Sequence, residues 1–245
     1  LYVITQILHY QYEDDPDIIG AVIGSTEVCA YAFDENFRLL SKRKNIAEDE
    51  DIKAVRFLGD MGYVVTYQQQ DPLFSIDFSD PEKLKVVDKV EMPGFSGYLH
   101  PVKNDLLLGI GEAEDGNAKI SLYDITDNNK LSIYDEKEID HIKYNNVLED
   151  YRKIFIDEEN NIAGFGGTDY GDSDDEKEEN REQNYYVLYH YDRDGKLQQI
   201  GEYPVKKEYR GFINQKFIGM RIGTWFYVIP EATSRQDDME IVPYS

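Results

Sequence analysis

Short runs of alternating apolar and polar residues, separated by Asp, Gly and Pro, recur along the whole chain and predict β-strands joined by tight turns. The clearest pair lies at 54–67, where Gly59 and Asp60 form the turn between two apolar runs. Two further strands are predicted at 73–78 and 84–91, again with a turn between them. The sequence therefore indicates a four-stranded antiparallel unit.

One element of this unit returns four times: an apolar strand ends in Asp, a turn follows, and a second strand leads away from it. The four residues are Asp34, Asp77, Asp124 and Asp192, at intervals of 43, 47 and 68 residues. The two shorter intervals are typical of a propeller blade, and the long one contains an acidic insert. We therefore predict an all-β fold, a β-propeller of four-stranded antiparallel blades with four to five blade equivalents.

The strand pattern divides residues 1–245 into blade portions within a single domain. These portions are expected at 1–47, 53–92, 97–139, 151–205 and 209–245. The first and last portions each contain less than a full set of strands, so we expect them to pair with each other or to face further blades.

The composition of the chain limits which binding partners and which structural sites are expected. The formal net charge of −23 opposes binding to nucleic acids and anionic membranes, which need Lys and Arg to neutralise phosphate. The chain has no run of about 18 apolar residues, so no membrane-spanning segment is predicted. Cys29 is the only cysteine, which excludes an intrachain disulfide and a cysteine zinc site.

Between residues 54 and 111 the sequence resembles a known family. The runs VRFLGDMGYVVTYQQQDPLFSIDFSDPEKLKVV, MPGFSGYLHP and LLLGIG are similar to bacterial secreted proteins with a C-terminal β-propeller domain distantly related to WD-repeats, and the likeness extends over about 27–135. The resemblance implies a propeller that forms the C-terminal part of a larger one, and an extracellular or cell-surface location. It implies no catalytic residues.

The acidic insert is the densest group of candidate metal ligands. Asp169, Asp172, Asp174 and Asp175 supply the carboxylate oxygens that Ca²⁺ prefers. An EF-hand loop beginning at Asp172 fails, because its sixth position is Lys177 and not Gly. We favour the interpretation that this segment is a solvated loop of like charges, and we therefore expect no cofactor. Binding of Ca²⁺ is the alternative.

His100 is the histidine with the strongest claim to a ligand-binding role, because it lies two residues from Tyr98 on a predicted inner strand. A structural histidine that bonds to backbone or a carboxylate is the competing interpretation. The other three histidines are scattered without metal-ligand spacing, so no zinc site is predicted.

Two classes of function fit these residues. The first is a non-catalytic module that binds a protein or a glycan at the cell surface. The second is a propeller hydrolase in which Glu112, Glu114 and Asp115 act at the mouth of the channel, alone or with Ca²⁺. We favour binding, because a catalytic site should place a fixed set of His or carboxylate groups at strand ends, and none stands out.

Overall fold

The computed structural model describes residues 1–12, 21–67, 71–128, 130–171, 183–205, 217–230 and 240–243. Within these ranges the regular structure is antiparallel β-sheet, apart from one short 3₁₀ helix, η1 (Tyr151–Lys153). The described part of the chain contains no helix with the length and hydropathy that crossing a membrane requires.

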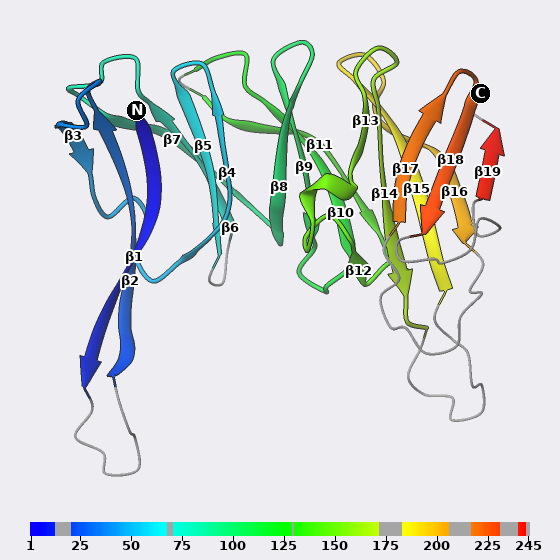
Figure 1. Ribbon diagram of the computed structural model, residues 1–245, viewed down its shortest axis with the longest axis horizontal. Coiled ribbons are helices and arrows are strands. Elements are labelled where there is room, and N and C mark those ends of the chain that lie inside the picture. Colours follow the sequence, from blue (N-terminus) through cyan, green and yellow to red (C-terminus); the bar gives the residue numbers. More distant parts are fainter. Residues whose placement is uncertain are drawn as a thin grey trace.

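The strands form five sheets in chain order, which we name blades 1 to 5 (Figure 1). Blade 1 consists of β1 (Tyr2–Tyr12), β2 (Ala21–Phe33) and β3 (Leu39–Arg43). Blade 2 consists of β4 (Asp51–Leu58), β5 (Met61–Tyr67), β6 (Asp71–Asp77) and β7 (Lys85–Met92). Blade 3 consists of β8 (Phe95–Val102), β9 (Leu106–Glu112), β10 (Ala118–Asp124) and β11 (Ser132–Ile139).

The last two blades are also antiparallel sheets. Blade 4 consists of β12 (Tyr144–Asn145), β13 (Phe155–Asp157), β14 (Ile162–Asp169), β15 (Gln183–Asp192) and β16 (Lys196–Val205). Blade 5 consists of β17 (Phe217–Ile222), β18 (Trp225–Pro230) and β19 (Glu240–Pro243). Strands pair in sequential order in blades 2 and 3, whereas β12 and β13 both pair with β14 in blade 4. The predicted propeller of antiparallel blades is confirmed.

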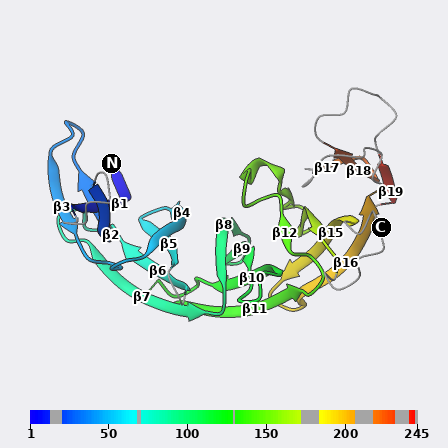
Figure 2. The same cartoon turned by 90° about the horizontal axis from the view of Figure 1, so that it is seen from below.

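The blades stand side by side along an open arc (Figure 2). The first strands of the blades, such as β4 and β8, lie on the concave side, and the last strands β7, β11 and β16 lie on the convex side. Side chains on the first strands therefore lie near the concave side, where Leu99 of β8 packs toward blade 2 and Tyr98 packs toward blade 4.

One backbone hydrogen bond recurs and fixes how the blades correspond. The N–H group at the end of the third strand donates to the carbonyl just before the second strand, from Phe78 to Asp60 at 2.8 Å and from Ile125 to Asp105 at 3.0 Å. Phe33 makes the same bond to Leu1 at 2.9 Å. Strand β1 thus corresponds to the second strand of the complete blades, although it is the innermost strand of its own sheet.

This correspondence divides the four recurring Asp residues into two pairs. Asp77 and Asp124 precede the bonded residues Phe78 and Ile125, whereas Asp34 and Asp192 follow Phe33 and Tyr191, which make the equivalent bonds. The turn that the sequence predicted after each Asp is present, and all four side chains accept backbone N–H groups within it. The bonds come from Asn36 to Asp34, Ser79 to Asp77, Thr126 to Asp124, and Gly195 to Asp192.

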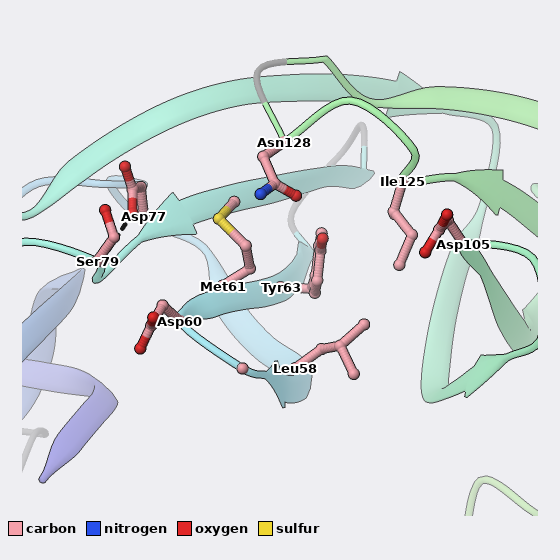
Figure 3. A pocket seen from close by; sticks show the side chains of 10 residues that line it. Leu58, Asp60, Met61, Tyr63, Asp77, Ser79, Asp105, Ile125 and Asn128 are labelled. Atoms are coloured by element: carbon pink, nitrogen blue, oxygen red, sulfur yellow. Dashed lines mark hydrogen bonds between the residues drawn. The ribbon is translucent and has the colours of Figure 1, made fainter.

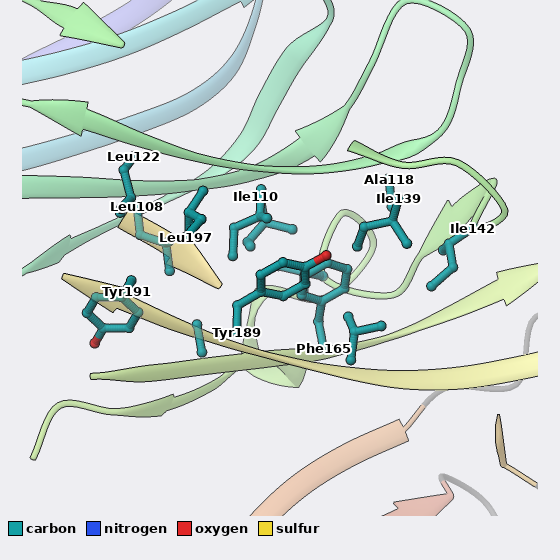
Figure 4. Packing of buried hydrophobic residues seen from close by; sticks show 14 of the residues in the cluster. Leu108, Ile110, Ala118, Leu122, Ile139, Ile142, Phe165, Tyr189, Tyr191 and Leu197 are labelled. Atoms are coloured by element: carbon teal, nitrogen blue, oxygen red, sulfur yellow. The ribbon is translucent and has the colours of Figure 1, made fainter. Parts of the chain in front are cut away.

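Apolar side chains fill the space between each blade and the next. The largest cluster lies between blades 3 and 4, where Ile110 from β9 faces Phe165 from β14 and Tyr189 from β15 (Figure 4). Tyr186, Tyr189 and Tyr191 are buried and pack within these clusters. Because burial of a large apolar side chain stabilises a fold by about 1.5–3 kcal/mol, these contacts hold the blades together.

Candidate functional site

The concave side of the arc contains a group of aromatic side chains that we name the inner-face patch: Tyr98, His100 and Tyr151. Tyr98 and His100 are two residues apart on β8 and therefore point to the same face of the strand. The Tyr98 hydroxyl lies 3.0 Å from Nδ1 of His100, and their rings are stacked with centroids 6.1 Å apart. The sequence had selected both residues, and the structure brings them into contact.

The third ring of the patch comes from η1. The side chain of Asp150 accepts the backbone N–H of Arg152 and caps this short helix. The cap places Tyr151 with its ring nearly parallel to that of Tyr98, at 7° and 6.5 Å between centroids. Tyr151 is 65% exposed, so the stack ends in an aromatic face open to solvent.

Burial sets the charge of the patch. Desolvation lowers the pKa of His100 and the nearby Arg56 lowers it further, while Glu158 has the opposite effect. Glu158 lies 3.8 Å from Nε2 of His100, which is too long for a hydrogen bond. Burial likewise raises the pKa of Tyr98. At neutral pH the patch is therefore an uncharged aromatic surface, with one arginine and one glutamate nearby.

The three candidate carboxylates lie elsewhere in blade 3. Glu112 ends β9 opposite Phe95, whereas His100 is opposite Leu108, so the two candidates are at different ends of the same strand pair. Burial raises the pKa of Glu112, against the influence of Lys53. Glu114 is exposed in the turn that follows. The structure does not bring Glu112 and Glu114 to His100.

Asp115 has a local role in the same turn. It accepts the backbone N–H of Asn117 at 3.0 Å, and this bond is the main reason its pKa is lowered. Its carboxylate also accepts from the Asn117 side chain at 2.6 Å. The carboxylate therefore stabilises the turn between β9 and β10.

The acidic insert lies mostly outside the described residues. Of its four candidate ligands, only Asp169 is described, at the end of β14, where it accepts the backbone N–H of Gly171 at 2.7 Å. Asp172, Asp174 and Asp175 are outside the described ranges. Among the residues that are described, no three His, Cys, Asp or Glu side chains are grouped so that they could hold a metal ion.

Sequence reasoning missed a pocket of about 520 Å³ between blades 2 and 3 (Figure 3). It lies at the end of these blades that carries the β4–β5, β6–β7, β8–β9 and β10–β11 turns. We name it the turn-end pocket. Three carboxylates line it, Asp60, Asp77 and Asp105, each from a different turn. The buried side chains of Met61 and Tyr63 provide apolar walls. The sequence predicted the turns at Asp60 and after Asp77, but it gave no sign that turns of successive blades meet at one edge.

Comparison with known proteins agrees with this architecture. A family model described as "Beta propeller domain" matches residues 22–221. An uncharacterised protein of Methanocaldococcus jannaschii is 40% identical over 136 residues, which covers 54% of this chain and 21% of that protein. An uncharacterised protein of Archaeoglobus fulgidus is 46% identical over 97 residues, 40% of this chain and 16% of that protein. The matched segments are thus about a fifth of the relatives' length or less.

Solved structures with a similar arrangement of strands have low sequence identity. The WD40 domain of Toxoplasma gondii coronin has a TM-score of 0.45 at 14% identity and covers 88% of this chain and 55% of that one. The N-terminal domain of Nup159 has a TM-score of 0.44 at 13% identity and covers 90% of this chain and 56% of that one.

Proposed function

The chain belongs to the β-propeller domain family, and on that premise we propose that it is a non-catalytic module that binds a protein partner through its inner-face patch. The observation that carries the proposal is the parallel stack of Tyr98 and Tyr151, with Tyr151 open to solvent. Tyrosine combines a large apolar area with a polar tip and few rotatable bonds, and it is enriched where proteins bind each other.

The charges beside the patch support the same function. Arg56 acts electrostatically on both Tyr98 and His100, so it lies near the two rings, and a carboxylate oxygen of Glu158 lies 3.8 Å from Nε2 of His100. An aromatic centre with polar groups of both signs at its edge is the usual composition of a protein-binding surface. A glycan, which also stacks on tyrosine rings, is the alternative ligand.

The hydrolase alternative finds less support in the same residues. Among the described residues, the polar contacts of His100 are with Tyr98 and Glu158. Only Glu158 is a carboxylate, and its side chain is 64% exposed, so these contacts provide no pair of carboxylates in contrasting environments, which acid and base catalysis by a carboxylate pair requires. The secreted, cell-surface setting is also a proposal, and it rests on the sequence resemblance described above.

Removal of the aromatic stack tests the proposal. The 245-residue chain would be immobilised as wild type, as Tyr98→Ala/Tyr151→Ala, and as Trp225→Ala, a control at an aromatic side chain that is 52% exposed in blade 5. We expect wild type and Trp225→Ala to retain the same proteins from extracts and culture medium of the source organism, and the double variant to lose them.

Two results would contradict binding through this surface. One is retention of the same proteins by all three forms. The other is turnover of ester, peptide or glycoside substrates by wild type that disappears in His100→Ala, because the site would then be catalytic. Circular dichroism of each form distinguishes a lost surface from a lost fold.

A further inference from the structure

Arg193 joins blades 3 and 4 at the turn end of the molecule. It extends from the β15–β16 turn and donates to both carboxylate oxygens of Asp124, at 3.0 and 2.9 Å. It also donates to the backbone carbonyls of Asn104 and Asp105, at 2.7 and 3.2 Å, and to the Thr126 hydroxyl. We name these four acceptor residues of blade 3 the Arg193 socket.

Blade 2 contains the same set of acceptors at corresponding positions. The recurring backbone bond pairs Asp60 with Phe78 in blade 2, and Asp105 with Ile125 in blade 3. Gly59 and Asp60 therefore correspond to Asn104 and Asp105.

The side-chain acceptors correspond as well. Asp77 and Ser79 take the places of Asp124 and Thr126, and each Asp accepts the backbone N–H of the residue two positions later, at 2.8 and 2.9 Å. The second socket is thus built from a carboxylate, a hydroxyl and two turn carbonyls.

The turn-end pocket lies at this second socket. Gly59, Asp60, Asp77 and Ser79 all line it (Figure 3). Across the pocket the β10–β11 turn of blade 3 brings Asn128. Counted from the recurring backbone bonds of Ile125 and Tyr191, the residue equivalent to Arg193 in this turn is Asp127, so blade 3 brings no guanidinium to its neighbour at that position. The described residues that line the pocket include no Lys or Arg.

We propose that the turn-end pocket binds the guanidinium group of an arginine side chain from a partner protein. Arg193 shows that this fold holds a guanidinium in the equivalent place with its own acceptors. A planar group with five N–H donors matches a carboxylate together with carbonyl oxygens, which an ammonium does not. The buried Met61, Tyr63 and Ile125 provide apolar surface for the aliphatic part of the side chain.

One difference between the sockets affects the strength of binding. Arg193 lies over the ring of Tyr134, 5.4 Å from its centroid. Asp88 and Asp135 make the same contact with the following blade, accepting the N–H groups of Leu131 and Leu197. Val87 therefore corresponds to Tyr134, and the pocket lacks the cation–π contact. A single arginine should bind weakly there, with the rest of the partner adding affinity.

A short peptide tests the pocket without knowledge of the partner. The probe is the tripeptide amide acetyl-Ala-Arg-Ala, titrated into the 245-residue chain while NMR follows the Met61 and Ile125 methyl groups. We expect saturable shifts of both signals. The citrulline peptide, which has the same shape without the charge, should bind about tenfold more weakly or worse, and the lysine peptide should lie between the two.

Three variants make the test specific. Asp77→Asn keeps an acceptor for the Ser79 N–H but removes the charge, and should weaken binding about tenfold. Asn128→Arg should supply the guanidinium internally and abolish the shifts. Asp34→Asn, a matched turn variant in blade 1, should bind as wild type does.

The proposal fails if citrulline or lysine binds as well as arginine, or if neither Asp77→Asn nor Asn128→Arg reduces the shifts. It fails also if Asp34→Asn reduces them as strongly, because the peptide would then be sampling the acidic surface in general. None of these results depends on the inner-face patch, so the two binding proposals stand or fall separately.

Discussion

At the scale of single residues, Arg193 makes the clearest energetic prediction. Replacement by Ala removes a paired interaction with Asp124 and leaves that partly buried carboxylate without its cation. Charge-assisted hydrogen bonds of this kind contribute more than neutral ones, so we expect Arg193→Ala to lower the free energy of unfolding by about 2 kcal/mol at pH 7. Urea unfolding measures the change.

The effect should depend on pH in a fixed direction. The Arg193 hydrogen bonds hold the pKa of Asp124 well below its usual range. A group with a lowered pKa contributes stability in full above its unfolded pKa of about 3.9, and this contribution is lost as the pH falls through the folded value. The difference between wild type and Arg193→Ala should therefore shrink in acid below about pH 4.

Arg152 provides the control for this prediction. Its guanidinium pairs with Asp150 and holds the pKa of that carboxyl at about 2, but the Arg152 side chain is 75% exposed and the pair lies within one short helix. Exposed pairs contribute little. If Arg152→Ala destabilised the chain as much as Arg193→Ala does, the contact of Arg193 with Asp124 between blades would stabilise the fold no more than an exposed local ion pair.

The same residues show where sequence reasoning stops. Each recurring Asp was predicted to end a strand and begin a turn, because that depends only on local chemistry. The contact of Asp124 with Arg193 joins residues in different blades and depends on strand register. Bulges between Leu122 and Tyr123 and between Leu188 and Tyr189 shift that register by amounts that an apolar–polar pattern does not encode.

At the scale of strands, substitution of Gly111 shows why the buried strand β9 of blade 3 contains a glycine at this position. A Cβ atom at this position of β9 would overlap the backbone carbonyl of Phe95 on the neighbouring strand β8. Backbone cannot yield as a flexible side chain does. We therefore expect Gly111→Ala to destabilise the chain by at least about 4 kcal/mol, measured by urea unfolding.

Gly116 is the matched glycine in the turn between β9 and β10. Its φ of +83° favours glycine, but an added Cβ would meet no atom within 4 Å. Alanine there should cost about 1–2 kcal/mol from backbone conformation alone. Equal losses for Gly111→Ala and Gly116→Ala would mean that conformation, and not the close approach of β8, explains both glycines.

The inner-face patch shows the same limit at the strand scale. Tyr98 and His100 were selected from the sequence because they lie two residues apart on a predicted inner strand. Tyr151 was missed, because it comes from a 3₁₀ helix in the connection between β12 and β13 of blade 4 and reaches Tyr98 only where blades 3 and 4 pack together. The spacing of apolar residues predicts which side chains share one face of a strand, but it does not predict which strands or helices contact each other.

At the scale of the whole molecule, the blades form a linear array in which each packs against its neighbours, with one apolar cluster at each of the four junctions. Phe165 is fully buried at the junction of blades 3 and 4. Phe165→Ala should lower the free energy of unfolding by about 3–5 kcal/mol through lost burial and a cavity.

In an array stabilised by nearest-neighbour contacts, such a loss destabilises mainly the blades that adjoin the altered junction. Hydrogen exchange followed by mass spectrometry should therefore show faster exchange in β8–β11 and β12–β16, while the protection of β1–β3 is retained. Equal acceleration in all five blades would instead show that the arc unfolds as one cooperative unit, with stability shared across every junction.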